Sequence, residues 1–368
     1  MKPVSASPLS PSVKVKLLNA GFLTSEELLQ LKPLQLSKEG GLSLEEALEV
    51  QQILREGVDL PGEGGAGLGS TALELLQQEE RSIVTFCSSL DAALGGGVPV
   101  GKTTELCGTP GMGKTQLCLQ LCIDVQIPEC FGGLGGEAVF VDTEGSLVVQ
   151  RVADMAQAAV QHCCLQDQDA EQRDALKDFT TESLLGHLYL MRCHDYVELL
   201  AQVQLLPDFL VKNPKVRLLV IDSLAFPFRR HFEDLSVRSR LLSGLAQQLI
   251  RMASQHRVAV VWTNQMTSQL RGGQWELVPA LGESWGHSAT QRLLLHWSGG
   301  RRLASVFKSP SQSESSVAYS VTREGFRDAG PLASSPSGRE QDSSSQSESK
   351  QDSSSQSGSK RPRTQEGQ

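Results

Sequence analysis

Several features are missing from this 368-residue sequence, and each absence excludes a class of protein. No run approaches the ~18 consecutive apolar residues that a membrane-spanning helix needs, so we expect no membrane partner. Residues 1–11 lack the charged-then-apolar pattern of a secretory signal. The eight cysteines form no Cys-x-x-Cys pair, and several lie in apolar runs. This usage indicates reduced cysteines of an intracellular protein, not zinc ligands or disulfides.

An excess of positive charge is missing as well. The formal net charge of −8 argues against a protein coated in basic surface. A nucleic-acid partner would have to be bound through local loops, since phosphate contacts need Lys or Arg beside the backbone. The bulk charge therefore neither establishes nor excludes DNA as a partner. The length and the 39% hydrophobic content do suffice for one large α/β domain, a small extra domain and a tail.

Residues 1–56 are predicted to form a small N-terminal helical domain. Two capping-box pairs mark helix starts: Thr24 with Glu27, and Ser43 with Glu46. A mostly apolar stripe at helical spacing follows the second pair: Leu44, Ala47, Leu48, Gln51 and Leu54. The pair Gly40-Gly41 resembles the turn of a helix-hairpin-helix module, whose amides can contact phosphate. A plain packing turn is an equal alternative.

The rest of the chain divides by composition. Glycine-rich residues 57–70 predict a flexible linker. In 71–328, apolar strands alternate with helical stretches, which predicts a mostly parallel sheet with helices on both faces and an antiparallel extension at the end. Residues 329–368 are rich in Ser and Gln, nearly repeat a ten-residue segment and predict a disordered tail. The tail carries a basic cluster that is either a nuclear import signal or a solvated end: Lys360, Arg361, Pro362 and Arg363.

The segment GTPGMGKT at 108–115 matches the phosphate-loop pattern Gly-x-x-x-x-Gly-Lys-[Ser/Thr] in full. An apolar strand is predicted before it and a helix after it. The glycines let backbone N–H groups surround a phosphate, and the helix N-terminus adds positive charge. Lys114 is expected to reach the β- and γ-phosphates, and the Thr115 hydroxyl to bind Mg²⁺. The predicted site for the triphosphate and Mg²⁺ consists of Gly108, Thr109, Pro110, Gly111, Met112, Gly113, Lys114 and Thr115.

Two further strand ends carry acids that suit hydrolysis. RLLVID at 217–222 predicts a buried strand that ends in Asp222, which would hold the water shell of the metal. AVFVDTEGS at 138–146 places Glu144 at a strand tip. Glu144 is either the general base for the attacking water or a solvated acid of a first helical turn beside a capping Asp or Thr.

VVWTNQM at 260–266 ends a third strand in two amides, Asn264 and Gln265. An amide at this place can sense loss of the γ-phosphate, or it can form ordinary turn hydrogen bonds. The guanine-reading pattern Asn-Lys-x-Asp is absent, which favours adenine and therefore ATP.

Together these segments resemble the RecA-like recombinase family, which predicts an α/β fold with a RecA-type P-loop ATPase core. The resemblance covers most of 13–328, and TEG after one strand and TNQ after another are its most specific motifs. The segments LAFPFRRHFEDLS and PALGESWGHSAT are most similar to the C-type paralogues of the eukaryotic strand-exchange recombinase.

The resemblance implies a role for individual residues. Glu144 is implied as the catalytic base and Gln265 as the nucleotide-sensing switch, while Lys114, Thr115 and Asp222 keep their roles. Segments 226–235 and 267–282 correspond to the two DNA-facing loops. The DNA contacts implied there are Arg229, Arg230, Arg271 and Trp275, the tryptophan by stacking on a base. The alternative is that these arginines are solvated loop charges.

The segment at 308–310 matches the cap that covers the neighbouring subunit's nucleotide in this family. Full recombinases usually carry an acid where this chain has Lys308. We hypothesise that Lys308 presents its charge to the γ-phosphate of the next subunit, as an arginine finger does.

Two departures from the family pattern concern assembly. The linker lacks the Phe-x-x-Ala plug that strings recombinases into filaments, and the second DNA loop is short and poor in basic residues. These departures predict a subunit of a hetero-oligomer. The implied partners are the B-type, D-type and XRCC-type paralogues, the recombinase, and single-stranded and branched DNA; the implied locations are nucleus, cytoplasm and mitochondrion.

The resemblance implies a DNA-dependent ATPase with weak turnover alone that acts in homologous recombination repair of double-strand breaks. It would help to load the recombinase on single-stranded DNA and act on late junctions. A scaffold that binds ATP without hydrolysis is the alternative. A small-molecule P-loop kinase is disfavoured, since no Arg-rich lid is evident.

Overall fold

The computed structural model describes residues 4, 7, 9–22, 24–31, 33–56, 73, 81–229, 232, 235–272 and 274–330. The chain divides into two units between Glu79 and Glu80, and each is described by itself. The linker predicted at 57–70 and almost all of the tail predicted at 329–368 lie outside the described residues. Among the described helices, none is long and apolar enough to cross a membrane.

The N-terminal unit is helical, as predicted. Its helices are α1 (Pro11–Asn19), α2 (Ser25–Gln30), α3 (Pro33–Glu39) and α4 (Leu44–Glu56). Both predicted capping boxes are present, at the starts of α2 and α4. The buried core includes Ala47 and Leu54 of the predicted stripe. Leu48 is 50% exposed, so its place in the stripe was wrong, and Val50 is buried on α4 instead.

The glycine turn between α3 and α4 uses most of its amides within the chain. Gly40 and Leu42 donate their N–H groups to carbonyls of α3 at 2.9 and 3.1 Å. The N–H of Ser43 donates to the Glu46 carboxylate at 2.8 Å. Gly41 has a φ of +62°, which favours glycine. These bonds favour the packing turn over the phosphate-contacting alternative.

The second unit is built on a sheet whose nine described strands run in the order β13-β12-β11-β10-β3-β7-β6-β4-β5. The parallel strands are β3 (Thr103–Gly108), β4 (Glu137–Asp142), β5 (Leu188–Arg192), β6 (Val216–Asp222), β7 (Ala259–Asn264) and β10 (Gln291–Ser298). The antiparallel extension is β11 (Arg301–Lys308), β12 (Ser315–Val321) and β13 (Phe326–Asp328). The predicted mostly parallel α/β class is confirmed.

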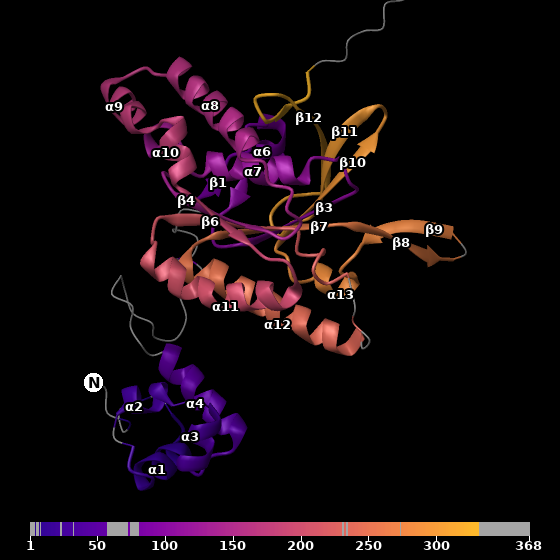
Figure 1. The fold of residues 1–368 in the computed structure, drawn as a ribbon. Helices are drawn as coiled ribbons and strands as arrows, with labels where there is room; N and C mark the ends of the chain where they lie inside the picture. The colour runs from indigo at the N-terminus through magenta and orange to yellow at the C-terminus, as the bar shows by residue number, and fades with distance from the viewer. Residues whose placement is uncertain are drawn as a thin grey trace, which may run out of the picture. The chain divides into compact units, whose positions relative to one another are not determined.

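Helices cover both faces of this sheet (Figure 1). The helices on one face are α6 (Ser88–Leu94), α7 (Lys114–Asp124), α8 (Val149–Leu165), α9 (Ala170–Asp178) and α10 (Thr181–Gly186). Those on the other are α11 (Tyr196–Lys212), α12 (Leu235–His256) and the short α13 (Glu283–Gly286). Residues of β4 alternate between the two cores, with Phe140 in one and Val139 and Val141 in the other. This period of two explains why a strand buried on both faces reads as a continuous apolar run.

A β-hairpin stands where the sequence predicted the second DNA-facing loop. Its strands β8 (Met266–Arg271) and β9 (Gln274–Pro279) pair with each other and project from the sheet (Figure 1). Trp275 is 73% exposed and pairs across the hairpin with Leu270, which is 56% exposed. The hairpin thus holds an aromatic side chain in solvent on a paired backbone. A smaller ribbon joins β1 (Ser82–Ile83) to β2 (Val98–Pro99), and a 3-10 turn covers Glu129–Phe131.

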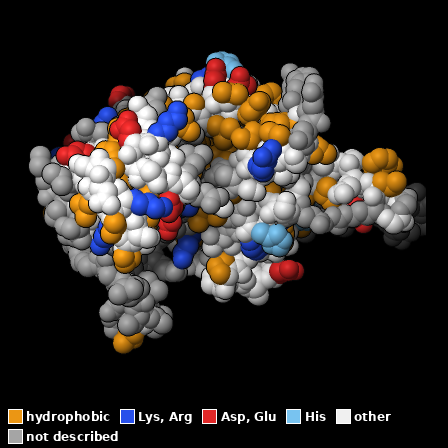
Figure 2. Space-filling model, turned by 90° about the horizontal axis from the view of Figure 1, so that it is seen from below, with side chains coloured by type: hydrophobic (Ala, Val, Ile, Leu, Met, Phe, Trp, Pro, Cys, Tyr) orange, Lys and Arg blue, Asp and Glu red, His pale blue; other side chains and the backbone are white. Residues whose placement is uncertain are grey.

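The charge on one face of the molecule is mixed. In Figure 2, Lys and Arg side chains are interspersed with Asp and Glu, without a broad field of either sign. This distribution agrees with the net charge of −8 and directs the search for anion-binding groups to individual loops.

Candidate active site

The phosphate loop joins β3 to α7, with its last two residues in the first turn of the helix. Gly111 and Gly113 have φ values of +80° and +94°, a region that favours glycine. Gly108 is needed for a different reason. A Cβ added to it would lie 2.6 Å from the carbonyl oxygen of Leu295 on β10. Close packing against the sheet therefore requires a glycine at this position.

The side chain of Tyr319 supports the loop from β12. Its hydroxyl donates to the Met112 carbonyl at 2.5 Å, and its ring stacks on Phe326 with centroids 4.5 Å apart. Burial raises the pKa of Tyr319 to about 12, so the hydroxyl keeps its proton. No sequence pattern near residue 319 connects Tyr319 with a loop two hundred residues earlier, so this residue could not be predicted from the sequence.

The phosphate-loop residues Lys114 and Thr115 lie beside Asp222, the acid at the end of β6. The Thr115 hydroxyl donates to Asp222 Oδ2 at 2.6 Å, and Thr263 donates to Oδ1 at 2.5 Å. Asp222 is buried, and this burial raises its pKa. The hydrogen bonds from Thr115 and Thr263 lower the pKa, but their effect is smaller than that of burial. Burial lowers the pKa of Lys114, whose ammonium donates to the carbonyls of Gly108 and Thr109 at 2.8 and 3.1 Å.

These groups open onto a pocket of about 460 Å³. Its lining residues come from the phosphate loop, the start of α7, the ends of β4, β6 and β7, and β11–β12: Pro110, Gly111, Gly113, Lys114, Thr115, Gln116, Glu144, Ser146, Asp222, Arg229, Gln265, Arg302 and Val321. The donor set fits a triphosphate with Mg²⁺. A hydroxyl and a carboxylate oxygen in contact are ligands that Mg²⁺ prefers, and a lysine beside glycine amides suits phosphate.

The turn after β4 gives different roles to Asp142 and Glu144, the two acids whose roles the sequence left open. Asp142 Oδ1 accepts the N–H groups of Gly145 at 2.7 Å and of Glu144 at 3.1 Å, and Asp142 forms an ion pair with Arg192 at 2.7 Å. Asp142 is therefore the turn-capping acid. The side chain of Glu144 lines the pocket, where its Oε1 accepts the hydroxyl of Ser223 at 2.6 Å.

The two amides after β7 face different surroundings. Gln265 lines the pocket and donates from Nε2 to Glu144 Oε1 at 2.6 Å, while its Oε1 accepts Arg229. Asn264 is buried and donates to Glu105 Oε1 at 2.8 Å. Strand alternation separates these neighbours, so only Gln265 of the two predicted amides lies in the pocket.

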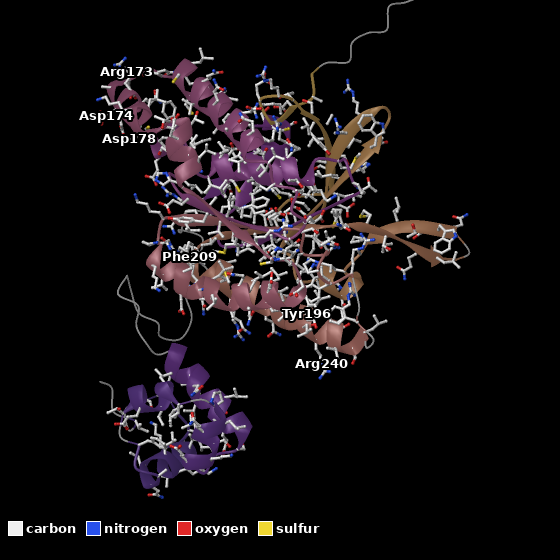
Figure 3. All side chains as sticks on the ribbon, in the orientation of Figure 1. Arg173, Asp174, Asp178, Tyr196, Phe209 and Arg240 are labelled. Atoms are coloured by element: carbon white, nitrogen blue, oxygen red, sulfur yellow. The ribbon has the colours of Figure 1, made fainter. Side chains whose placement is uncertain are left out.

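An aromatic cluster anchors the segment that carries Arg229. The rings of Phe228 and Phe232 stack with centroids 5.9 Å apart. The ring of Tyr196, which is labelled on α11 in Figure 3, lies 4.9 Å from that of Phe232. This cluster holds the start of the predicted first DNA loop against α11. Arg230 lies outside the described residues, and the side chain of Arg271 does as well.

The other predicted functional residues do not line this pocket or lie outside the described residues. Trp275 is on the hairpin, and Lys360, Arg361, Pro362 and Arg363 lie outside the described residues.

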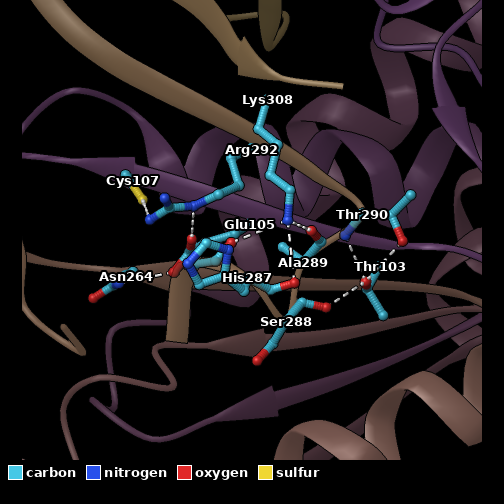
Figure 4. Close-up of polar contacts among 11 residues, drawn as sticks. Thr103, Glu105, Cys107, Asn264, His287, Ser288, Ala289, Thr290, Arg292 and Lys308 are labelled. Atoms are coloured by element: carbon cyan, nitrogen blue, oxygen red, sulfur yellow. Dashed lines mark hydrogen bonds and ion pairs between the residues drawn. The ribbon is translucent and has the colours of Figure 1, made fainter. Parts of the chain in front are cut away.

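Lys308 is held within its own chain. Its ammonium donates to the carbonyls of Gly286, His287 and Ala289 at 3.2, 3.1 and 2.6 Å (Figure 4). Burial and the neighbouring Arg292 lower the pKa of Lys308. These bonds hold the Lys308 ammonium within its own chain, and its contact with the γ-phosphate of a neighbouring subunit stays a prediction. All three N–H donors of the ammonium are therefore used within this chain, where Lys308 caps the carbonyls at the C-terminal end of α13.

Comparison with known proteins agrees with the architecture. The sequence model of the Rad51 family matches residues 77–329. The chain is 57% identical over 338 residues to the DNA repair protein RAD51 homolog 3 of Cricetulus griseus, covering 89% of this chain and 92% of that protein. It is 41% identical over 269 residues to the protein of the same name from Dictyostelium discoideum, covering 71% and 70%.

A more distant relative extends the likeness to archaea. The DNA repair and recombination protein RadA of Aeropyrum pernix is 31% identical over 325 residues, covering 87% of this chain and 94% of that protein. The match includes the phosphate loop, Asp222 and the antiparallel extension within one continuous family domain. This chain therefore belongs to the Rad51 family, whose members are RecA-like ATPases of DNA repair and recombination.

Proposed function

We propose that this chain is a DNA-dependent ATPase subunit of a paralogue complex in homologous recombination repair. The observation that supports DNA dependence is a hydrogen-bonded chain of three side chains. Arg229, in the predicted first DNA loop, donates to Gln265, and Gln265 donates to Glu144 in the pocket. A change in what Arg229 binds can therefore alter the hydrogen bonds of the Glu144 carboxylate, because Gln265 connects the two side chains.

The chemistry in the pocket divides among the chain's own residues. Bound ATP with Mg²⁺ supplies a γ-phosphoryl group whose charge the metal partly neutralises. Thr115 and Asp222 would hold the metal, and Lys114 would exchange its loop carbonyls for phosphate oxygens. Glu144 has one oxygen on Ser223 and Gln265, and we assign its Oε2 to accept the proton of the attacking water.

DNA enters this scheme through competition for Arg229. A DNA phosphate is a stronger acceptor for a guanidinium than the neutral amide of Gln265. Its arrival would withdraw Arg229, free the Gln265 oxygen and let that side chain turn toward the γ-phosphate. Glu144 would then lose one of its two donors and be held only by Ser223. Turnover would rise because the base is released.

The test compares three variants in the assembled complex. Arg229→Gln should bring the ratio of DNA-stimulated to basal turnover close to one. Glu144→Gln should retain ATP binding but reduce turnover by about 10²–10⁴-fold. Arg240 is an exposed residue of α12 that does not line the pocket (Figure 3). Arg240→Gln therefore removes the same charge outside the pocket and should behave as wild type. Full DNA stimulation of Arg229→Gln would reject the coupling.

A scaffold that binds ATP without hydrolysis is the second candidate. The two donors on Glu144 Oε1 favour it, because they restrain the proposed base. Under this function Glu144→Gln should support repair as well as wild type does. Retained repair with undetectable turnover in both proteins would decide for the scaffold.

The proposed partners are the B-type, D-type and XRCC-type paralogues, the strand-exchange recombinase, and single-stranded and branched DNA. We propose that the complex loads the recombinase and acts on late junctions, in the nucleus with cytoplasmic and mitochondrial pools. The domain boundaries at 57–70 and 329 remain proposals, as does nuclear import through 360–363. Fluorescence imaging of a chain with residues 360–363 changed to alanine tests the import signal. Unchanged nuclear signal would reject it.

A further inference from the structure

A third cation lines the nucleotide pocket, on the wall opposite the proposed catalytic residues. Arg302 comes from β11, in the antiparallel part of the sheet on one side of β3. Glu144, Asp222 and Gln265 lie at the ends of β4, β6 and β7, on the other side of β3 (Figure 1). The phosphate loop follows β3 and therefore lies between the two walls.

Arg302 differs from the other two cations of the pocket in having no acceptor among the residues that the structure describes. Lys114 donates to two loop carbonyls and Arg229 to Gln265. The Nε atom of Arg302 is buried, and within the described part of the chain it has no hydrogen-bond partner. No ion pair found between described residues includes Arg302. A buried charged donor is costly unless something supplies an acceptor.

Two cross-strand neighbours hold this side chain in position. Trp297 is its partner on β10, and the guanidinium carbon lies 5.4 Å from the Trp297 ring centroid. Tyr319 is its partner on β12, and the Tyr319 hydroxyl binds Met112 of the phosphate loop. A guanidinium stacked on an indole keeps its in-plane N–H groups available, and this planar fork matches two oxygens of a phosphate.

We propose that Arg302 binds a phosphate that ATP and ADP share, the α- or the β-phosphate. The γ-phosphate belongs to the opposite wall, beside Glu144 and Gln265. This inference rests on the proposed ATP site and adds to Lys114 a second cation that acts within the same chain. Since the contact does not involve the γ-phosphate, Arg302 strengthens the binding of both nucleotides equally and does not distinguish them.

The experiment measures dissociation constants on the full chain with Mg²⁺, using fluorescent ADP and a fluorescent non-hydrolysable ATP analogue. Arg302→Gln should raise the Kd for both nucleotides by about tenfold to hundredfold, because a charge-assisted hydrogen bond is lost. Arg301→Gln is the matched control. It removes the same charge from the residue that precedes Arg302 on β11, whose side chain points to the opposite face of the sheet. This control should change Kd by less than about twofold.

A second variant separates binding geometry from charge. Arg302→Lys keeps the charge but lacks the fork, and its Kd should lie between those of wild type and Arg302→Gln; it also serves if Arg302→Gln does not fold. Unchanged Kd values for the Arg302 variants overturn the inference, as does an equal loss in Arg301→Gln. Weaker binding of the ATP analogue alone overturns the placement on a shared phosphate. If wild type binds neither nucleotide, the proposed function is overturned as well.

Discussion

Removal of the buried carboxylate of Glu105 is expected to destabilise the second unit strongly. Glu105 is fully buried on β3, the strand that leads into the phosphate loop. Its Oε2 accepts Arg292 Nε at 2.5 Å, and its Oε1 accepts Asn264 Nδ2 at 2.8 Å (Figure 4). The Arg292 side chain is 13% exposed. Glu105→Leu would leave a buried guanidinium and a buried amide without this acceptor.

The magnitude follows from what each partner loses. Breaking a buried ion pair by removing one member costs about 3–5 kcal/mol, since the other charge stays buried. Glu105→Gln should cost less, about 2–3 kcal/mol, because the amide oxygen can still accept Arg292. Asn264 Oδ1 is buried and has no hydrogen-bond partner in the described part of the chain, so a flip of Asn264 would provide an acceptor for the new amide group. The double variant Glu105→Leu with Arg292→Leu should recover most of the loss, since no unpaired charge remains.

Urea unfolding monitored by tryptophan fluorescence measures these changes. All four tryptophans, at 262, 275, 285 and 297, lie in the second unit, so the signal is specific to it. The midpoint should fall in the order wild type, Glu105→Gln, Glu105→Leu. A double variant no more stable than Glu105→Leu would refute the reasoning, because the loss would then come from packing and not from a stranded charge.

Three other substitutions have expected outcomes. Gly108→Ala should lower the free energy of unfolding by about 1–3 kcal/mol, since the new Cβ meets a backbone carbonyl. Gly186→Ala, whose Cβ would have no atom within 4 Å, is its control in the same urea assay. Equal urea midpoints for the two variants would contradict the clash. Burial raises the pKa of Asp91 to about 6, so the folded state holds a proton that the unfolded state loses near pH 4, and stability should fall as pH rises from about 4 to about 6. Asp91→Asn should flatten this profile in thermal unfolding, whereas an unchanged slope would argue against the raised pKa. Lys308→Met should lower the free energy of unfolding of the isolated chain, measured by urea titration, by about 1 kcal/mol, because three carbonyls lose a charged donor; a loss of turnover seen only in the complex would instead support a role between subunits.

Much of the fold could be read from local pattern. The phosphate loop, its flanking strand and helix, and the strand ending in Asp222 depend on residues adjacent in sequence, so their geometry is a local property. The capping boxes at Thr24 and Ser43 succeeded for the same reason. The β8–β9 hairpin was predicted as a loop, because its polar residues give no strand pattern although the backbone forms strand hydrogen bonds.

Other assignments depended on which strands became neighbours. Sequence could place Lys308 in a cap segment, but only the packing of β11 beside α13 showed that three carbonyls hold its ammonium. It could name Asn264 and Gln265 together, yet the direction of β7 sends one to Glu105 and the other to Glu144.

The phosphate loop at 108–115 and the α/β fold could be predicted from the sequence, because turn chemistry and apolar periodicity act between near neighbours. What surrounds that loop depends on the packing of distant strands. Tyr319 and Arg302 reach the pocket because β11 and β12 add to the sheet beside β10 and β3. Such contacts join residues about two hundred positions apart, and side-chain burial and direction at that range follow from strand order, which no local pattern encodes.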